Sequence, residues 1–516
     1  MSGKNSMSLF SAVLIGVTCM IGSGWLFSSQ LTAVQAGNWG FLAWFMAAIL
    51  VIMIGLCYNV VVRYYPVRGA TARSSALSHN GIFGMPFAFA NWFGIMVVIA
   101  TEAQATTQYL GGALGDSSTL SNIFMSDGAL TRYGKLIALL FLIGYLMVNY
   151  YGVKLLAKVN NVVTVLKVFV PTFAVIVFLI AAFGSNATQG SAMANFQQAA
   201  NENYGIISAF LAIVNAGLIY SFNGFQTIVS YSSEVKNPKR NVPLSIILSV
   251  LVALTLYLLL QVGFMAAVPH QELMAQGGWH HLNFDSPLMK LAVLLGINFL
   301  VILLLADSVI SPSATGYTYM GSASRMLYAM SSEKQMPSFL AKLHPKHHVS
   351  RPSLLLNFIL AAIFLWNADS WAGLMVIVTG YHIIGYMAAP MSMGAFEPKK
   401  RYPGSVVFAL LGLLLLTLGQ HDLFMVVISL SIVMLVYGLT QSGQGQVKLI
   451  FHFALPFLVY LWTMLVVIEL YHYMLLPVIV SFVLAIAVSM IFYWMATAPN
   501  FVNACQKHRG KVDIVD

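Results

Sequence analysis

Two glycines and a serine, Gly22, Ser23 and Gly24, interrupt the first long apolar run of the sequence, which extends from residue 9 to residue 34. Glycine disfavours a helix interior by about 1 kcal/mol relative to alanine. In lipid, each unsatisfied backbone N–H or C=O group costs several kcal/mol, so a break is tolerable where it lines a cavity or holds a ligand. The half-helix after the break would direct its N–H groups and positive dipole end at that ligand, which suits a carboxylate. Alternatively, the glycines let another helix pack closely, as small residues do in membrane bundles.

A second interruption of the same kind falls at residues 220–226, within the apolar run from 206 to 229. It reads Tyr-Ser-Phe-Asn-Gly-Phe-Gln. The two interrupted runs are the first and the sixth of the chain. This spacing is typical of membrane proteins built from two inverted repeats of five helices, whose site lies at the paired breaks near the middle of the bilayer. The expectation depends on the pattern of breaks and not on sequence similarity between the halves.

Four ionisable residues lie inside apolar runs: Glu102, Lys167, Asp307 and Glu469. Charges at that depth usually face the bundle interior and often mark ion or proton pathways. Burial disfavours the ammonium form of Lys167 and a nearby acid favours it, so Lys167 is a candidate proton carrier. The alternative is a structural pair with Asp307, or a cage of carbonyl groups that never titrates. Glu102 and Asp307 suit either hydrogen bonding or proton handling, and Glu469, beside two tyrosines, is expected in an interfacial belt.

The composition indicates that these residues are held by membrane helices. The chain has 516 residues, of which 59% are hydrophobic and 8% charged, whereas soluble domains carry about 25% charged residues. Mean hydropathy is +0.83. We therefore predict an all-α integral membrane protein with about fourteen spans near the ~20 residues that a bilayer requires. The expected spans lie at about 8–36, 39–63, 83–112, 133–150, 156–183, 205–231, 242–268, 286–328, 352–367, 371–395, 404–419, 423–440, 448–469 and 473–497.

The domain prediction follows from these spans. A ten-helix core covers 8–395, with one repeat at about 8–183 and the other at about 205–395, and additional transmembrane helices follow at 404–497. The three cysteines show neither metal-ligand spacing nor a pairing pattern, so we expect no cofactor and no metal.

The charge distribution predicts the topology. With a cytoplasmic amino terminus, 21 of the 25 lysines and arginines fall in cytoplasmic segments, as the positive-inside rule requires. Both termini are then cytoplasmic, and the net charge of +10 needs no nucleic acid. The sequence has no glycine-rich phosphate loop followed by Lys-Ser/Thr, which argues against an ATP-driven pump.

Four motifs in order resemble the amino acid–polyamine–organocation (APC) superfamily of transporters, which have the leucine-transporter fold. The resemblance covers roughly residues 8–395. The motifs are Ile21 to Gly24; Asn149 to Lys154 with Lys158 and Lys167; Phe222 to Gln226 followed by Glu234 to Pro243; and Ser324 to Met330 with Met336 and Pro337.

The resemblance implies roles for the residues of both breaks. Ser23 and Gly24 would hold the substrate carboxylate, and backbone carbonyls of Met20, Ile21, Tyr220 and Asn223 would take the α-amino group. Tyr220 would also be the aromatic gate. The substrate-binding residues expected on this basis are Met20, Ile21, Gly22, Ser23, Gly24, Tyr220, Phe222, Asn223, Gly224, Phe225 and Gln226.

The resemblance also implies that the ammonium of Lys167 occupies the place of a sodium ion between the first and eighth spans. Gly16, Ser308 and Ser311 are its expected partners, and Glu102 and Asp307 complete the candidate proton-coupling set. Many relatives carry an acid where this chain has Gln226, which disfavours a dibasic or polyamine substrate.

We therefore predict a secondary active amino acid transporter of the inner or plasma membrane, not an enzyme. It would import a neutral or acidic amino acid together with protons by alternating access. A proton-independent amino acid exchanger is the nearest alternative, and an ion channel is a third. The expected partners are the amino acid, protons and the lipid bilayer, with no nucleic acid, and the oligomeric state is left open.

Overall fold

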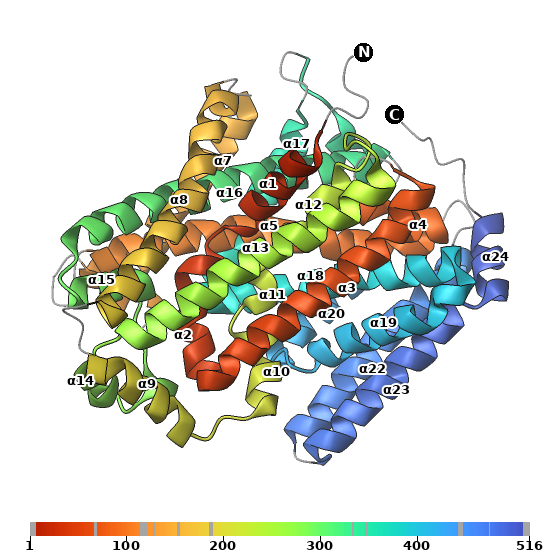
Figure 1. The fold of residues 1–516 in the computed structure, drawn as a ribbon. Helices are drawn as coiled ribbons and strands as arrows, with labels where there is room; N and C mark the ends of the chain where they lie inside the picture. Colours follow the sequence, from red (N-terminus) through yellow and green to blue (C-terminus); the bar gives the residue numbers. More distant parts are fainter. Residues whose placement is uncertain are drawn as a thin grey trace.

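The computed structural model describes residues 7–66, 70–113, 121–126, 129–151, 155–184, 189–332, 335–345, 349–441, 447–473 and 475–508. Almost all of this is helix (Figure 1). Within these ranges, ten helical segments are long and apolar enough to cross a membrane. The predicted class, an all-α integral membrane protein, is confirmed.

The first of the expected spans is divided into two helices, and the helices of the next four spans follow it. The first span is α1 (Leu9–Met20) and α2 (Gly24–Ala36), followed by η1 (Gly37–Trp39), α3 (Gly40–Tyr64), α4 (Ala70–Ser78), α5 (Gly81–Ala113), α6 (Ser121–Phe124), α7 (Arg132–Tyr151), α8 (Leu155–Phe183) and α9 (Gln189–Asn201). Strands β1 (Met125–Ser126) and β2 (Ala129–Leu130) form an antiparallel pair after α6.

The sixth expected span is also divided. It consists of α10 (Ile206–Asn215), α11 (Leu218–Ser221) and α12 (Phe225–Ser230), and α13 (Pro238–Ala267), α14 (His270–Ala275), η2 (Trp279–His281), α15 (Pro287–Leu294), α16 (Asn298–Ser332), η3 (Ser338–Ala341), α17 (Arg351–Asn367) and α18 (Trp371–Phe396) follow. The eighth apolar run, expected as one span, is two helices. A turn at Gly296, whose φ of 69° favours glycine, separates α15 from α16.

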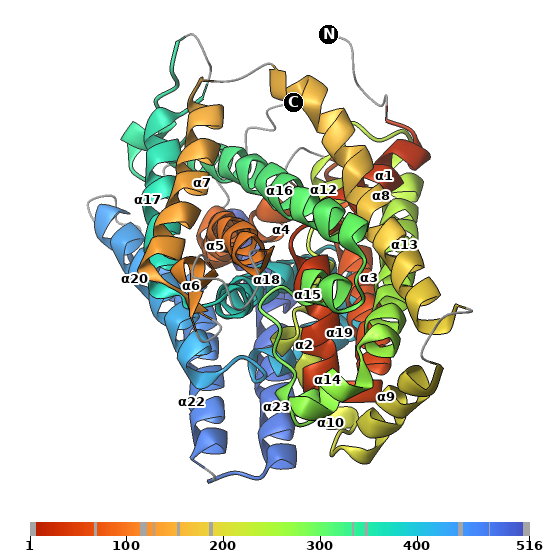
Figure 2. The ribbon, with the colours of Figure 1, turned by 90° about the vertical axis from the view of Figure 1, so that its left-hand side faces the viewer.

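The carboxyl-terminal part adds η4 (Pro398–Lys400), α19 (Arg401–Leu415), α20 (Gln420–Gln441), α21 (Val447–Phe453), α22 (Leu455–His472), α23 (Val478–Ala496) and α24 (Pro499–Lys507). Helix α19 packs against α18 and α23, and α22 packs against α20 and α23. Figures 1 and 2 show α22 and α23 side by side at the margin of the molecule. At the end of α22, Glu469 accepts hydrogen bonds from the amide of Gln420 at 2.6 and 2.7 Å.

Two groups of helices meet at the centre. Helix α5 packs extensively against α16 and α18 and also contacts α7 and α17, whereas α13 packs against α1, α3 and α8. Helices α4 and α24 lie at one end of the bundle, and α9 and α14 lie at the opposite end (Figure 1). The divided first and sixth spans therefore lie between the two groups, where side chains from both can reach the breaks.

The junction between α4 and α5 is closed by the carboxyl-terminal helix. The buried His79 ring places Nε2 3.1 Å from the Ala496 carbonyl. The amide of Asn80 donates to the Cys505 carbonyl at 3.2 Å, and the amide of Gln506 donates to the Ser78 carbonyl at 3.2 Å. Burial lowers the pKa of His79 to about 4, because desolvation disfavours the charged imidazolium.

Candidate functional site

The first span breaks where its glycines predict. Helix α1 ends at Met20 and α2 begins at Gly24. Between them the N–H of Gly22 turns back to the Met20 carbonyl at 3.1 Å. The first N–H groups of a helix have no intrahelical partner, so those of α2 face the interior of the protein at the break.

The sixth span breaks around two glycines in left-handed conformations, Gly217 with φ 73° and Gly224 with φ 121°. The Gln226 side chain holds the second of these turns. Its Oε1 accepts the N–H of Gly224 at 2.9 Å, and its Nε2 donates to Oδ1 of Asn223 at 2.6 Å. Gln226 therefore stabilises the break internally through both ends of its amide.

The two breaks are in direct contact at Gly24 and Gly224. A Cβ atom added to Gly24 would lie 2.8 Å from Ser221 Oγ, and one added to Gly224 would lie 2.5 Å from the backbone carbon of Cys19. Both separations are shorter than side chains tolerate. These glycines thus permit the first and sixth spans to approach backbone to backbone.

Tyr257 of α13 ties the same two breaks together. Its buried hydroxyl lies 3.1 Å from the Met20 carbonyl and 2.9 Å from the Ser221 carbonyl. Since a phenol carries a single proton, the two carbonyls share one donor. Tyr257 could not be predicted as a site residue, because an isolated tyrosine in an apolar run resembles any packing aromatic.

A small cavity lies at the junction of the breaks. Its walls combine backbone from both breaks with side chains of α5 and α16. The lining residues are Cys19, Met20, Gly22, Gly24, Val98, Glu102, Tyr220, Asn223, Thr315 and Tyr319.

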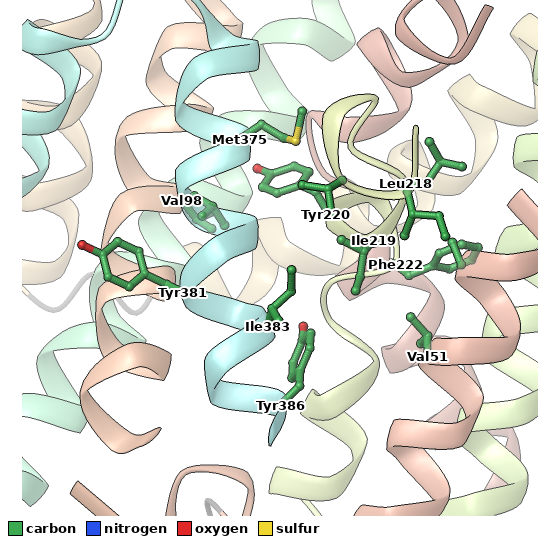
Figure 3. Packing of buried hydrophobic residues seen from close by; sticks show 14 of the residues in the cluster. Val51, Val98, Leu218, Ile219, Tyr220, Phe222, Met375, Tyr381, Ile383 and Tyr386 are labelled. Atoms are coloured by element: carbon green, nitrogen blue, oxygen red, sulfur yellow. The ribbon is translucent and has the colours of Figure 1, made fainter. Parts of the chain in front are cut away.

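Five of the eleven predicted binding residues line this cavity: Met20, Gly22, Gly24, Tyr220 and Asn223. Phe222 and Phe225, also among the predicted binding residues, do not line it. Phe222 packs edge-on against Trp44 and Tyr257, and Phe225 packs against Tyr386. Figure 3 shows the segment with Phe222 between α3 and α18. The short α11 and the turn after it rotate both rings away from the cavity, which the sequence does not specify.

Ile21, Ser23, Gly224 and Gln226 also lie outside the set of lining residues. Ser23 nevertheless belongs to the cavity's polar framework. Its Oγ accepts the indole N–H of Trp371 at 2.9 Å and lies 3.4 Å from the Tyr220 hydroxyl.

An aromatic cluster near the start of α18 includes Tyr220, which lines the cavity. The Trp371 ring stacks on Phe27 with centroids 4.3 Å apart and meets Tyr220 edge-on at 5.6 Å. The predicted gate residue Tyr220 is thus one of three rings. Trp371 was not predicted as a site residue, since nothing local distinguishes it from a tryptophan at the membrane interface.

Glu102 projects from α5 onto the first break. Its Oε1 accepts the Tyr220 hydroxyl at 3.1 Å and the N–H of Ser23 at 3.4 Å. The side chain is only 1% exposed. Of the two interpretations of Glu102 given above, hydrogen bonding to the break is a feature of the structure, and proton handling stays a prediction.

Lys167 lies close to the break, but its hydrogen bond differs from the predicted one. Its ammonium donates to Thr315 Oγ1 at 2.7 Å, and Thr315 in turn donates to the Ser311 carbonyl at 3.2 Å. Ser308 donates to the Leu305 carbonyl instead. Gly16 faces Ile228 and Ser249 of other helices. Thr315, one helical turn after Ser311, was missed because the side that α16 turns toward Lys167 is set by tertiary packing.

Asp307 is buried on α16 within electrostatic range of Lys167. Within the described part of the chain, neither of its carboxylate oxygens has a hydrogen-bond partner. Lys167 is also within electrostatic range of Glu102. Two buried acids therefore share one buried amine, and a proton on any of the three changes the charge balance of the site.

The comparisons with known proteins agree with this architecture. The model of a family described as amino acid permease matches residues 7–501. The glutamate/serine transporter AimA of Bacillus subtilis (strain 168) is 34% identical over 388 residues, which cover 75% of this chain and 70% of that protein. The aspartate-proton symporter of the same organism is 29% identical over 404 residues, covering 76% and 73%. The branched-chain amino acid permease BcaP of Bacillus subtilis (strain 168) is 21% identical over 350 residues, which cover 67% of this chain and 70% of that protein.

Proposed function

The chain belongs to the amino acid permease family of the APC superfamily, and from that premise we propose that it is a proton-coupled symporter of a neutral or acidic amino acid. Membership confirms two predictions, that the chain is a multi-pass amino acid transporter of this superfamily and that it is not an enzyme. The substrate and the proton coupling are proposals. They are supported by the names of two relatives, a glutamate/serine transporter and an aspartate-proton symporter.

The observation that carries the proposal is the cavity at the paired breaks. An amino acid needs donors for its carboxylate and acceptors for its ammonium. The start of α2, at Ser23 and Gly24, supplies N–H groups and a positive dipole end. Backbone carbonyls of the breaks supply acceptors beside it.

The neutral amide of Gln226 supports a neutral or acidic substrate. Both ends of that amide are engaged within the break, so the residue offers a dibasic substrate no carboxylate. We expect L-serine, L-glutamate or L-aspartate to compete for uptake better than L-arginine. Competition assays with arginine as the tightest ligand would contradict this choice.

Coupling would operate through Lys167. In its charged form it donates to Thr315 of α16 across from the first break, and a charge-assisted hydrogen bond is roughly twice as strong as a neutral one. Loss of the proton would weaken the tie between α8 and α16 and permit the bundle to change its facing side. Termini on the cytoplasmic side, supported by the lysine and arginine distribution, complete the proposal.

The test is uptake by purified protein in proteoliposomes with imposed pH and sodium gradients. We expect substrate accumulation that depends on the proton gradient and does not depend on the sodium gradient. Lys167→Ala should lose accumulation, while Lys342→Ala, a change at an exposed lysine, should retain it. Sodium dependence, or accumulation by Lys167→Ala, would refute the coupling. Counterflow without net accumulation in the wild type would favour the proton-independent exchanger.

A further inference from the structure

The Glu102 carboxylate lies where the proposed function puts the substrate carboxylate. Its Oε1 uses two donors of the break, the N–H of Ser23 and the hydroxyl of Tyr220. A Cβ on Gly22 would lie 3.1 Å from the same oxygen. The carboxylate thus rests against the bare backbone of the break, at the positive end of α2.

The second oxygen of Glu102 sets this carboxylate apart from a purely structural one. Oε2 is buried, and among the described residues none gives it a hydrogen bond. A buried carboxylate held only for stability normally has its lone pairs satisfied. One oxygen held by the anion-binding donors and one without a partner is the arrangement of a group that occupies a ligand's place.

The other titratable groups near Glu102 restrict which of them takes a proton. Those within electrostatic range are Tyr145 of α7, Lys167 of α8, Tyr220 of α11 and Tyr319 of α16. Cys19 of α1 lines the same cavity. Tyrosines and cysteines are ordinarily neutral at pH 6 to 8, whereas glutamate and lysine ordinarily carry a charge. Glu102 and Lys167 are therefore the groups of this cluster whose charge a proton would change.

We propose that Glu102 is an internal substitute for the substrate carboxylate, and that the arriving amino acid displaces it as it takes up one proton from water. This inference rests on the proposed function and adds Glu102 as the residue at which substrate and proton binding are linked, beside Lys167, which ties α8 to α16. The incoming carboxylate replaces Oε1 as acceptor of the Ser23 N–H and the Tyr220 hydroxyl. The released Glu102 carboxylate becomes a neutral carboxylic acid, so the cavity gains one carboxylate and one proton together.

The first test is calorimetric binding of L-serine, L-glutamate and L-aspartate to the purified wild-type protein. In buffers of different ionisation enthalpy, the ligand that binds should carry about one proton with it. Its Kd should rise about tenfold per pH unit where Glu102 is ionised, because one proton is taken up per ligand. Binding without proton uptake and with a flat pH profile would overturn the proposal and leave the transport function intact.

The second test is Glu102→Gln, which keeps the shape and acceptor oxygen but cannot titrate. We expect it to bind the same amino acid with a Kd independent of pH and with no proton uptake. Glu469→Gln, the same change at an acid hydrogen-bonded to Gln420 in the carboxyl-terminal helices, should retain the wild-type slope. Proton uptake by Glu102→Gln equal to that of the wild type would assign the proton to another group and refute the proposal.

Different results would contradict the proposed transport function and the proposed role of Glu102. If none of the twenty amino acids binds the wild-type protein at any pH, the proposed function fails and this inference fails with it. If Glu102→Gln does not fold, the wild-type protein still tests the proposal, because an absent proton uptake overturns it without any variant.

Discussion

The Tyr257 hydroxyl gives the sharpest test of whether the two breaks act as one site. Replacing Tyr257 by phenylalanine removes the donor that the Met20 and Ser221 carbonyls share and leaves the buried ring in place. The Met20 carbonyl retains the Gly22 N–H. The Ser221 carbonyl loses the tyrosine and stays in the interior.

The expected free-energy cost of Tyr257→Phe follows from the hydrogen bonds of these two carbonyls. One proton cannot make two full hydrogen bonds, so the loss is that of one bond plus one buried acceptor left without a donor. A net hydrogen bond is worth about 0.5–1.5 kcal/mol, and a buried unsatisfied group costs about 1–3 kcal/mol. The two terms together give about 1.5–4.5 kcal/mol. The lower end corresponds to a roughly tenfold weaker affinity if the arrangement that Tyr257 holds is the one that binds substrate.

The assay is substrate affinity and thermal unfolding of the purified protein, side by side. Tyr460→Phe is the matched control, since its buried hydroxyl lies 3.0 Å from Ser489 within the carboxyl-terminal helices. Both variants should be less stable, but only Tyr257→Phe should lose affinity. An unchanged affinity in Tyr257→Phe would refute the argument that this hydroxyl aligns the breaks for binding.

Two further predictions concern the first break and the α4–α5 junction. Gly24→Val should weaken substrate binding about tenfold or more through overpacking against Ser221, whereas Gly144→Val, where the added Cβ has open space, should bind as the wild type does. Wild-type affinity in Gly24→Val would remove this contact from the site. Burial lowers the pKa of His79 to about 4 in the folded protein. In the unfolded chain a histidine has a pKa near 6.5 and binds a proton at a higher pH. The free energy of unfolding should therefore have its full value above pH 6.5 and fall by about 2 kcal/mol between pH 7 and 5. His79→Gln should lose this acid sensitivity in thermal unfolding, and an equal pH slope in the variant would contradict the assignment.

The positions of the two breaks could be predicted because they depend on local composition. Glycine beside serine or asparagine within an apolar run disfavours a continuous helix whatever surrounds it. The same holds for the all-α class and the need for a cavity at the breaks. A single turn at Gly296, by contrast, was hidden inside an apolar run and divided one expected span into α15 and α16.

The partners of the breaks could not be predicted, because they come from distant segments. Trp371 meets Ser23 across 348 residues of sequence, and Tyr257 meets Met20 across 237. Thr315 in place of Ser311 as the partner of Lys167 depends on the rotation of α16 about its axis. Phe222 and Phe225 turned away from the cavity for the same kind of reason, since the three short pieces of the sixth span set their directions.

The closure of the α4–α5 junction by α24 has a consequence for synthesis of the protein. The partners of His79, Asn80 and Ser78 lie 417, 425 and 428 residues later in the chain. At about 5–20 residues per second, a ribosome needs roughly 20–80 seconds to make that interval. During this time the early helices can enter the membrane, but the junction between α4 and α5 lacks the hydrogen-bond partners that it has in the folded protein. The α4–α5 junction can therefore complete its hydrogen bonds only after α24 has been made.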